Sequence, residues 1–185
     1  MKNALPEEIP FQTNQTSQRM WYDKFIFFDK QEGLTELPGD RYFSCPLTED
    51  EIKLHSHIKE FYPDFLIKDK ITIPSEFFLP VELRQLLEYS NGGGIINGAR
   101  EFGYFSLKNI RYYYFAYGFP KWTPYFLPIA FNGGGIFYAY DFRDLTNIKL
   151  VAVGAGNLEY ESAVIIGKNL DEILSKNINI EDELD

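Results

Sequence analysis

Six runs of aromatic and β-branched residues follow one another in the second half of the chain, separated by glycine, proline and asparagine. Runs of about four to eight such residues between turn residues are typical of β-strands. Because no helical pattern lies between them, we expect neighbouring runs to pair as an antiparallel sheet, without the crossover helices of a parallel one. The predicted strands span residues 102–107, 110–117, 125–131, 136–142, 148–153 and 162–166.

Three other segments carry apolar side chains at helical spacing. The first begins with a capping box formed by Thr48 and Glu51 and ends at Pro63. The second begins at Pro80, with leucines along one face, and the third begins at Asn169. Helices before and after a block of strands predict a single α+β domain, with a mostly antiparallel sheet of about five or six strands.

The motif Asn-Gly-Gly-Gly-Ile occurs twice and is predicted to turn the chain both times. Successive glycines disfavour a helix, because each loses about 1 kcal/mol relative to alanine. The first copy should end a helix and the second should start a strand. The motif is either a ligand cradle or a backbone requirement. If it is a backbone requirement, at least one glycine in each copy should hold a φ that β-branched residues reach only at a cost of about 1–3 kcal/mol, and Gly93→Val and Gly134→Val should destabilise the fold. The predicted turn residues are Asn91, Gly92, Gly93, Gly94, Asn132, Gly133, Gly134 and Gly135.

The segment Tyr112–Tyr117 has five aromatic side chains in six residues, without the polar alternation of a strand buried on one face. Either both faces of this predicted strand are covered, or one aromatic face is offered to a partner. We favour burial, because tyrosine often packs its ring and leaves its hydroxyl in water.

Composition restricts the kinds of partner. The chain has 185 residues and a formal charge of −9, which argues against nucleic-acid binding because phosphate contacts need clustered lysine and arginine.

The single Cys45 cannot form an internal disulfide, and the N-terminus lacks the apolar stretch of a secretion signal, so a cytoplasmic location is expected. Residues 122–140 carry no charge, but their prolines and glycines would break a lipid-exposed helix, so no membrane span is predicted.

The sequence shows no pattern that predicts a catalytic, metal or cofactor site. His55 and His57 lie two positions apart on one predicted helix, where their side chains point to opposite sides. Neither glycine triplet is followed by the Lys-Ser or Lys-Thr of a phosphate loop, and the segment 154–159 lacks the third glycine of a dinucleotide site. The carboxylate pairs Asp141 with Asp144 and Glu159 with Glu161 are interpreted as solvated strand ends rather than as an acid and a base.

Several short motifs in order resemble the SUKH superfamily, also known as the Smi/Knr domain family. They are Leu79-Pro80, Asn91-Gly92-Gly93, Phe102-Gly103, Leu127-Pro128-Ile129-Ala130, Gly134-Gly135-Ile136-Phe137-Tyr138-Ala139-Tyr140-Asp141 and Leu170-Asp171-Glu172-Ile173-Leu174. The resemblance covers residues 46–177, which leaves 1–45 as an N-terminal extension, packed on or flanking the domain, and 178–185 as an acidic, solvated tail. One departure is Asn132, where the family often has an acid.

The resemblance implies an α+β domain without a catalytic motif. For most bacterial members it implies an immunity protein that neutralises a cognate toxin, often a nuclease, whereas a eukaryotic branch regulates cell-wall assembly and signalling through protein contacts. We therefore expect a protein partner, foremost a basic toxin, with a scaffold or regulatory role as the alternative and an enzyme or small-ligand binder as a third class. The residues expected to contact the partner are Asp141, Asp144, Glu159 and Glu161. The oligomeric state is not predicted.

Overall fold

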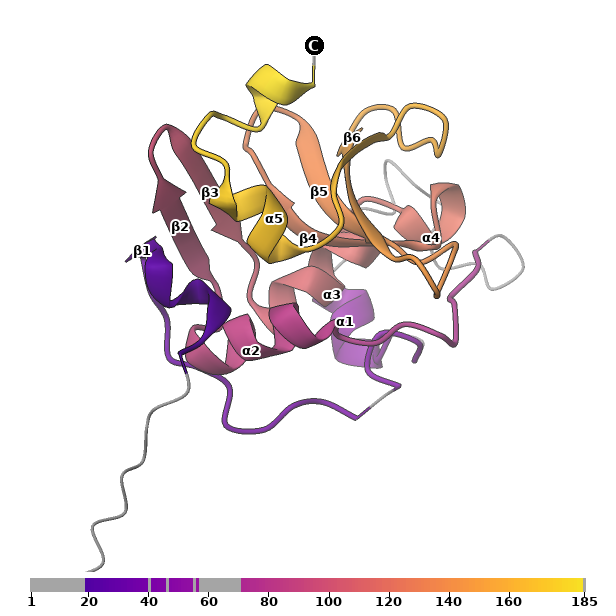
Figure 1. Ribbon diagram of the computed structural model, residues 1–185. Helices are drawn as coiled ribbons and strands as arrows, with labels where there is room; N and C mark the ends of the chain where they lie inside the picture. The colour runs from indigo at the N-terminus through magenta and orange to yellow at the C-terminus, as the bar shows by residue number, and fades with distance from the viewer. Residues whose placement is uncertain (1–18, 40, 46, 55, 57–70, 185) are drawn as a thin grey trace, which may run out of the picture.

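The computed structural model describes residues 19–39, 41–45, 47–54, 56 and 71–184. Within these residues seven strands form one antiparallel sheet, in which each strand pairs with its neighbours in the sequence (Figure 1). The predicted α+β class and antiparallel sheet are confirmed, with more strands than expected. The strands are β1 (Ile26–Phe28), β2 (Gly93–Asn97), β3 (Arg100–Tyr104), β4 (Phe126–Phe131), β5 (Ile136–Asp141), β6 (Lys149–Gly154) and β7 (Val164–Gly167).

The helices of the described residues are α1 (Glu49–Leu54), α2 (Val81–Tyr89), α3 (Leu107–Ala116), α4 (Phe119–Trp122) and α5 (Leu170–Ser175), with 3-10 turns at Trp21–Lys24 and Glu181–Glu183. The predicted capping box of α1 is confirmed, because the Thr48 N–H donates to Glu51 Oε2 at 2.8 Å and the Glu51 N–H donates to Thr48 Oγ1 at 3.3 Å. Apart from Ser56, the rest of the first predicted helix, including His55 and His57, lies outside the described residues.

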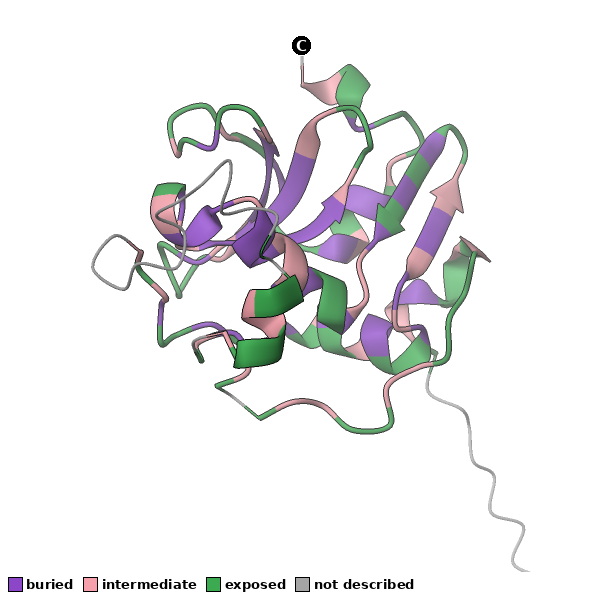
Figure 2. Ribbon diagram, turned by 180° about the vertical axis from the view of Figure 1, so that it is seen from behind, coloured by how far each residue is buried: buried purple, intermediate pink, exposed green. Residues whose placement is uncertain are grey.

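Strand β5 shows which helices cover each face of the sheet. The ring of Phe137 lies 4.6 Å from that of Tyr117 and 5.3 Å from that of Phe119, so α3 and α4 pack on one face. On the opposite face the Tyr140 hydroxyl donates to Glu82 Oε1 of α2 at 2.9 Å. Successive strand residues point to opposite faces, and β5 is buried on both (Figure 2). The prediction of a covered central strand is therefore confirmed.

Helix α5 contacts both β2 and β7, which lie near opposite ends of the sheet. The sheet therefore curls around α5, as Figure 1 shows. The N-cap of α5 forms as predicted: Asn169 Oδ1 accepts the Glu172 N–H at 2.8 Å, which places Leu170, Ile173 and Leu174 in the core.

The aromatic run is a helix, so the predicted strand over residues 110–117 is wrong. Ser106 caps α3 by accepting the Asn109 N–H at 3.2 Å, and one face of the helix packs against β4. Tyr114 and Phe115 are buried, whereas the flanking tyrosines of the run are half-buried. The preference of aromatic residues for strands is weak, and the packing of one helical face overrides it here.

Strand β2 contains two of the glycines predicted to form the first turn, so the turn assignment of Gly93 and Gly94 is wrong. The turn comprises Asn91 and Gly92, whose φ is +104°, and Gly93 begins the strand with a φ of +115°. A Cβ at Gly94 would overlap the ring of Phe28 on β1. These glycines therefore let a strand form where a larger side chain would keep β1 from packing on β2.

The second glycine triplet lies in the loop between β4 and β5. Asn132 Oδ1 accepts the N–H groups of Gly134 at 2.8 Å and Ile136 at 2.9 Å, which closes the loop. Gly133 and Gly135 have φ values of +74° and +107°, whereas Gly134 is not among the residues with positive φ. Gly134→Val is therefore a poor probe of backbone strain in this loop.

The described part of the N-terminal segment completes the sheet. Strand β1 pairs with β2 at the edge, and the ring of Tyr22 stacks on Tyr89 of α2 at 4.8 Å. Further along, the Leu34 N–H donates to the Leu87 carbonyl at 2.9 Å, so the chain runs beside α2.

The C-terminal tail is only partly solvated, because Glu181 and Asp182 are exposed as expected whereas other tail residues pack on the domain. Ile180 is buried, and Glu183 forms ion pairs with Arg100 of β3 and with Lys176. The Arg100 side chain is 1% exposed, and a buried guanidinium needs an opposite charge. The acidic residues near the C-terminus thus supply the counter-charge of a buried β3 residue.

Candidate functional site

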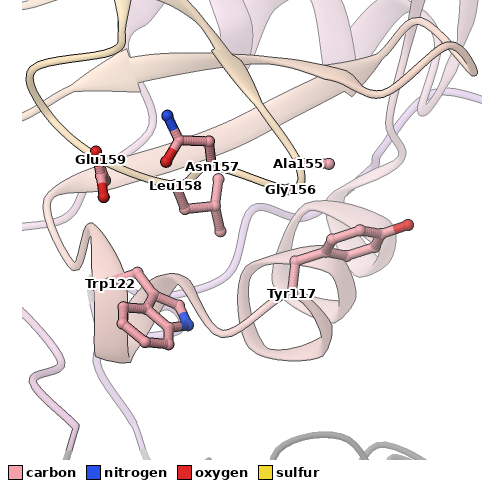
Figure 3. Close-up of a pocket in the computed structure, with 7 residues that line it drawn as sticks. All are labelled: Tyr117, Trp122, Ala155, Gly156, Asn157, Leu158 and Glu159. Carbon is pink, nitrogen blue, oxygen red and sulfur yellow. The ribbon is translucent and has the colours of Figure 1, made fainter.

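A pocket of about 270 Å³ opens between the end of α3, helix α4 and the loop that joins β6 to β7. Its two walls come from distant parts of the sequence (Figure 3). The residues lining it are Tyr117, Trp122, Ala155, Gly156, Asn157, Leu158 and Glu159.

The helical wall depends on Gly118, which lies between α3 and α4 with a φ of +74°. Its N–H donates to the Phe115 carbonyl at 3.0 Å and its carbonyl accepts the Trp122 N–H at 3.1 Å, so it ends one helix and begins the next. A Cβ at Gly118 would lie 3.4 Å from Trp122 Cδ1, because the indole packs over the glycine. Trp122 is thereby held beside Tyr117 and remains 49% exposed.

The loop wall, residues 155–163, is held by its own hydrogen bonds. The Asn157 N–H donates to the Gly154 carbonyl at 3.0 Å, and Ser162 Oγ donates to the carbonyls of Asn157 and Glu159 at 3.0 Å. Leu158 points inward and is 7% exposed, so the loop is anchored in the core. Preorganised walls of this kind reduce the conformational entropy lost on binding.

Tyr160 connects the loop to β4 and β5. Its hydroxyl accepts the Tyr125 N–H at 3.0 Å, and its ring meets Phe126 edge-on at 4.9 Å. The Arg143 guanidinium lies 4.5 Å from the centre of the Tyr160 ring. Burial raises the pKa of the Tyr160 hydroxyl, so Tyr160 is neutral at physiological pH.

The four acids predicted to contact a partner do not form a single cluster in the structure. The Asp141 carboxylate shares the Nε–H of Arg143 between its two oxygens and accepts a second hydrogen bond from Nη2 at 2.7 Å. These hydrogen bonds raise the pKa of Arg143, and the charge of Glu161 also contributes to that rise. Glu159 lines the pocket. Asp144 instead accepts the Thr146 hydroxyl at 2.6 Å within the β5–β6 loop, and hydrogen bonds from Thr146 lower its pKa. Contact of these acids with a partner remains a prediction.

Sequence reasoning missed the aromatic wall of the pocket. Because the run up to Tyr117 was assigned to a strand, Trp122 was not recognised as a helix residue beside it. The signal was present in Gly118-Phe119-Pro120, since a glycine at a helix end followed by a proline in the first turn of the next helix is typical of two consecutive helices.

The pocket combines features of protein-binding surfaces. Trp122 is exposed and Tyr117 is half-buried, and tryptophan and tyrosine are frequent among the residues that contribute most to binding energy. The Lys121 ammonium lies 4.5 Å from the centre of the Trp122 ring, so the indole already attracts a cation. The described residues contain no group of three or more histidine, cysteine or acidic side chains arranged to hold a metal ion.

Several strong pKa shifts lie away from the pocket, including that of the Tyr138 hydroxyl, whose pKa is raised by burial. A hydrogen bond from Arg111 lowers the pKa of Glu51 to about 2, and burial raises the pKa of Tyr104 to about 12. Both follow from structural contacts in the interior.

Within the part of the chain that the structure describes, no helix has both the length and the apolar character needed to cross a membrane.

Comparison with protein families gives one match. Residues 76–176, more than half of the chain, match the SMI1 / KNR4 family (SUKH-1). This range contains β2 to β7, α2 to α5 and the whole pocket. A search of curated proteins finds no match.

Proposed function

Because the chain belongs to the SMI1 / KNR4 family (SUKH-1), we propose that it is a non-enzymatic protein-binding domain that neutralises a cognate bacterial toxin. The resemblance to the SUKH superfamily implies this role for most bacterial members. The alternative is a scaffold or regulatory protein without a toxin partner. A protein that neutralises a toxin would act in the cytoplasm, where the single Cys45 stays reduced.

The observation that carries the binding proposal is the pocket of Figure 3. Trp122 is 49% exposed although a hydrogen-bonded turn holds its backbone, so its indole can be covered by a partner without much loss of conformational entropy. Glu159 on the opposite wall adds a negative charge. An aromatic anchor beside a carboxylate suits a basic protein surface.

A gene for a large secreted toxin beside the gene of this protein would favour the toxin proposal over the scaffold alternative, and the direct test is neutralisation of any toxin encoded there. We expect co-expression to restore growth and the purified pair to bind. Trp122→Ala should weaken binding about thirtyfold, since removal of a central aromatic residue costs about 2 kcal/mol. Glu159→Lys should weaken it by charge reversal. Val81→Ala and Glu88→Lys are matched controls on α2, because both residues are exposed there, and they should bind like the natural protein.

The outcomes separate the candidate functions. Binding without restored growth would favour the scaffold alternative. Normal binding by Trp122→Ala and Glu159→Lys would place the interface elsewhere on the molecule.

Charge gives a second test of the toxin proposal. With a net charge of −9, the protein should attract a basic toxin electrostatically before the two surfaces touch. The association rate should therefore fall as salt rises, while the dissociation rate changes less. An association rate that does not depend on salt would remove electrostatic steering and leave the binding proposal in place.

Absence of catalysis is tested separately. We expect the purified protein to show no nuclease, phosphatase or NTPase turnover. A metal-dependent activity that co-purifies with the folded monomer and is lost in His57→Ala, Asp141→Asn or Asp144→Asn would replace the binding proposal with an enzymatic one.

A further inference from the structure

The sheet opens between β3 and β4. Strands β2 and β3 pair over five residues each, but β3 and β4 share the single pair Tyr104↔Ala130. From Gly103 back to Arg100, β3 therefore has no strand partner on the side that faces β4. An open strand edge of this kind presents unpaired N–H and C=O groups.

The direction of those backbone groups follows from the last bond between the two strands. The Phe105 N–H donates to the Ile129 carbonyl of β4 at 2.8 Å. Alternate residues of a strand direct their backbone groups to the same neighbour, so Gly103 and Glu101 also point their N–H groups toward the opening. This geometry matches the addition of another strand.

A cleft of about 400 Å³ occupies the opening, between β3, the β4–β5 hairpin and the segment before the C-terminus. Its walls combine aromatic rings with polar groups. The residues lining it are Phe28, Glu101, Phe102, Gly103, Phe131, Asn132, Tyr138, Asn179 and Glu181. It is separate from the pocket of Figure 3, with which it shares no residue.

The cleft is acidic. Glu101 and Glu181 line it, and no lysine or arginine does. The nearby Arg100 is directed instead to Glu183 and is buried. A carboxylate pair without a neighbouring cation on the cleft wall complements a positively charged side chain.

Glu181 is held in position with one oxygen still available. Its Oε1 accepts hydrogen bonds from Asn132 Nδ2 and from the Tyr138 hydroxyl, both at 2.8 Å. Both of these side-chain hydrogen bonds go to Oε1 and leave Oε2 to other donors. Burial raises the pKa of Glu181, but hydrogen bonds from Asn132, from its own backbone N–H and from Tyr138, together with the charge of Arg100, lower it by more. The net shift is downward, so the group is ionised at neutral pH.

We propose that this cleft binds an extended segment of a protein partner that carries lysine or arginine. The segment adds to the open edge of β3, with its backbone bonded to Glu101 and Gly103 and a cationic side chain between Glu101 and Glu181. This inference deepens the proposed binding function and rests on it, because it names a second contact surface and the chemistry of the segment that occupies it.

The test uses capped seven-residue peptides in which valine alternates with lysine or, as a matched probe, with glutamate. Each is titrated into the ¹⁵N-labelled full chain at low salt. The lysine peptide should shift the amide signals of Glu101 and Gly103, and the glutamate peptide should not. Glu101→Gln should weaken the lysine peptide about fivefold, as expected for one partly exposed charge pair.

Two more variants separate backbone from charge. Glu101→Pro removes the N–H that faces the cleft and should abolish the shift at Gly103, and edge positions of strands tolerate proline. Glu76→Gln removes an exposed acid outside the cleft and should bind the peptide like the natural protein. Equal binding of both peptides, or shifts that leave Glu101 and Gly103 unchanged, would overturn the inference.

The same signals distinguish this inference from the proposed function. If the toxin is neutralised but leaves the amides of Glu101 and Gly103 unshifted, the cleft inference is lost and the function stands. If the lysine peptide shifts these amides while no toxin binds, the cleft stands and toxin neutralisation is lost.

Discussion

Replacement of Glu51 by glutamine should destabilise the protein in a manner that depends on pH. Glu51 Oε1 accepts Arg111 Nε at 2.5 Å, and Oε2 accepts Nη2 at 3.0 Å. The Arg111 side chain is 6% exposed, and its Nη1 also donates to the Tyr42 carbonyl at 2.6 Å. The pair therefore joins α1 and the segment before it to α3. Glutamine has nearly the same shape but leaves the buried guanidinium without its carboxylate.

The magnitude follows from the pKa of Glu51, which the hydrogen bond from Arg111 lowers from 4.5 to about 2. A depression of that size corresponds to about 3 kcal/mol of stability at neutral pH. Because 28% of the Glu51 side chain remains exposed and water screens the pair, we reduce this to about 2 kcal/mol. That is a large part of the stability of a domain, which is about 5–15 kcal/mol.

The sign of the pH dependence is determined by the lowered pKa. The contribution of Glu51 is fully present above the unfolded pKa near 4.5 and is lost as the pH falls toward about 2. In urea unfolding at pH 7, the free energy of unfolding of Glu51→Gln should therefore be about 2 kcal/mol lower than that of the natural protein. This difference should shrink below pH 4.5. Glu49→Gln, on the exposed face of the same helix turn, should stay within about 0.5 kcal/mol. A difference between natural protein and Glu51→Gln that stays constant down to pH 2.5 would refute the reasoning.

Two further predictions concern the glycine motifs and their neighbours. Asn132→Asp should destabilise by about 1 kcal/mol at pH 7 in chemical denaturation, because the aspartate keeps the loop acceptor but replaces the donor to Glu181 with a second negative charge. Gly94→Val should destabilise the protein by about 2 kcal/mol or more in thermal unfolding, because the valine side chain would displace Phe28 and with it β1. Gly134→Val should change the stability by less than about 0.5 kcal/mol.

Each of these has a control or a contrary outcome. The effect of Asn132→Asp should shrink as the pH falls and the new carboxyl is protonated, and a difference that does not change with pH would show that charge repulsion is not its cause. Asn109→Asp on the exposed first turn of α3 is the matched control and should be neutral or slightly stabilising. Equal melting temperatures for Gly94→Val and Gly134→Val would contradict the packing of Phe28 against Gly94.

Local signals in the sequence determined the elements whose patterns are complete within a few residues. The capping box at Thr48 and the N-cap at Asn169 each depend on residues three positions apart, so both helix starts were predicted correctly. The runs that became β3 to β7 were recognised, and the antiparallel sheet was predicted correctly although α3 and α4 lie between β3 and β4. The motifs that resemble the SUKH superfamily likewise lie in short contiguous segments, and the family match confirms that resemblance.

Tertiary structure decided whatever depends on contacts between distant residues. The aromatic run became α3 because one of its faces packs on β4, and Gly94 became part of a strand because Phe28 lies against it. Arg100 and Glu183 are 83 residues apart, so neither the burial of the arginine nor the order of the acidic segment could be read from its neighbours in sequence. The pocket likewise joins Trp122 to Glu159. Burial of apolar surface and pairing of charges bring such groups together only when the chain folds. A local sequence pattern therefore does not show which distant residue each group will contact.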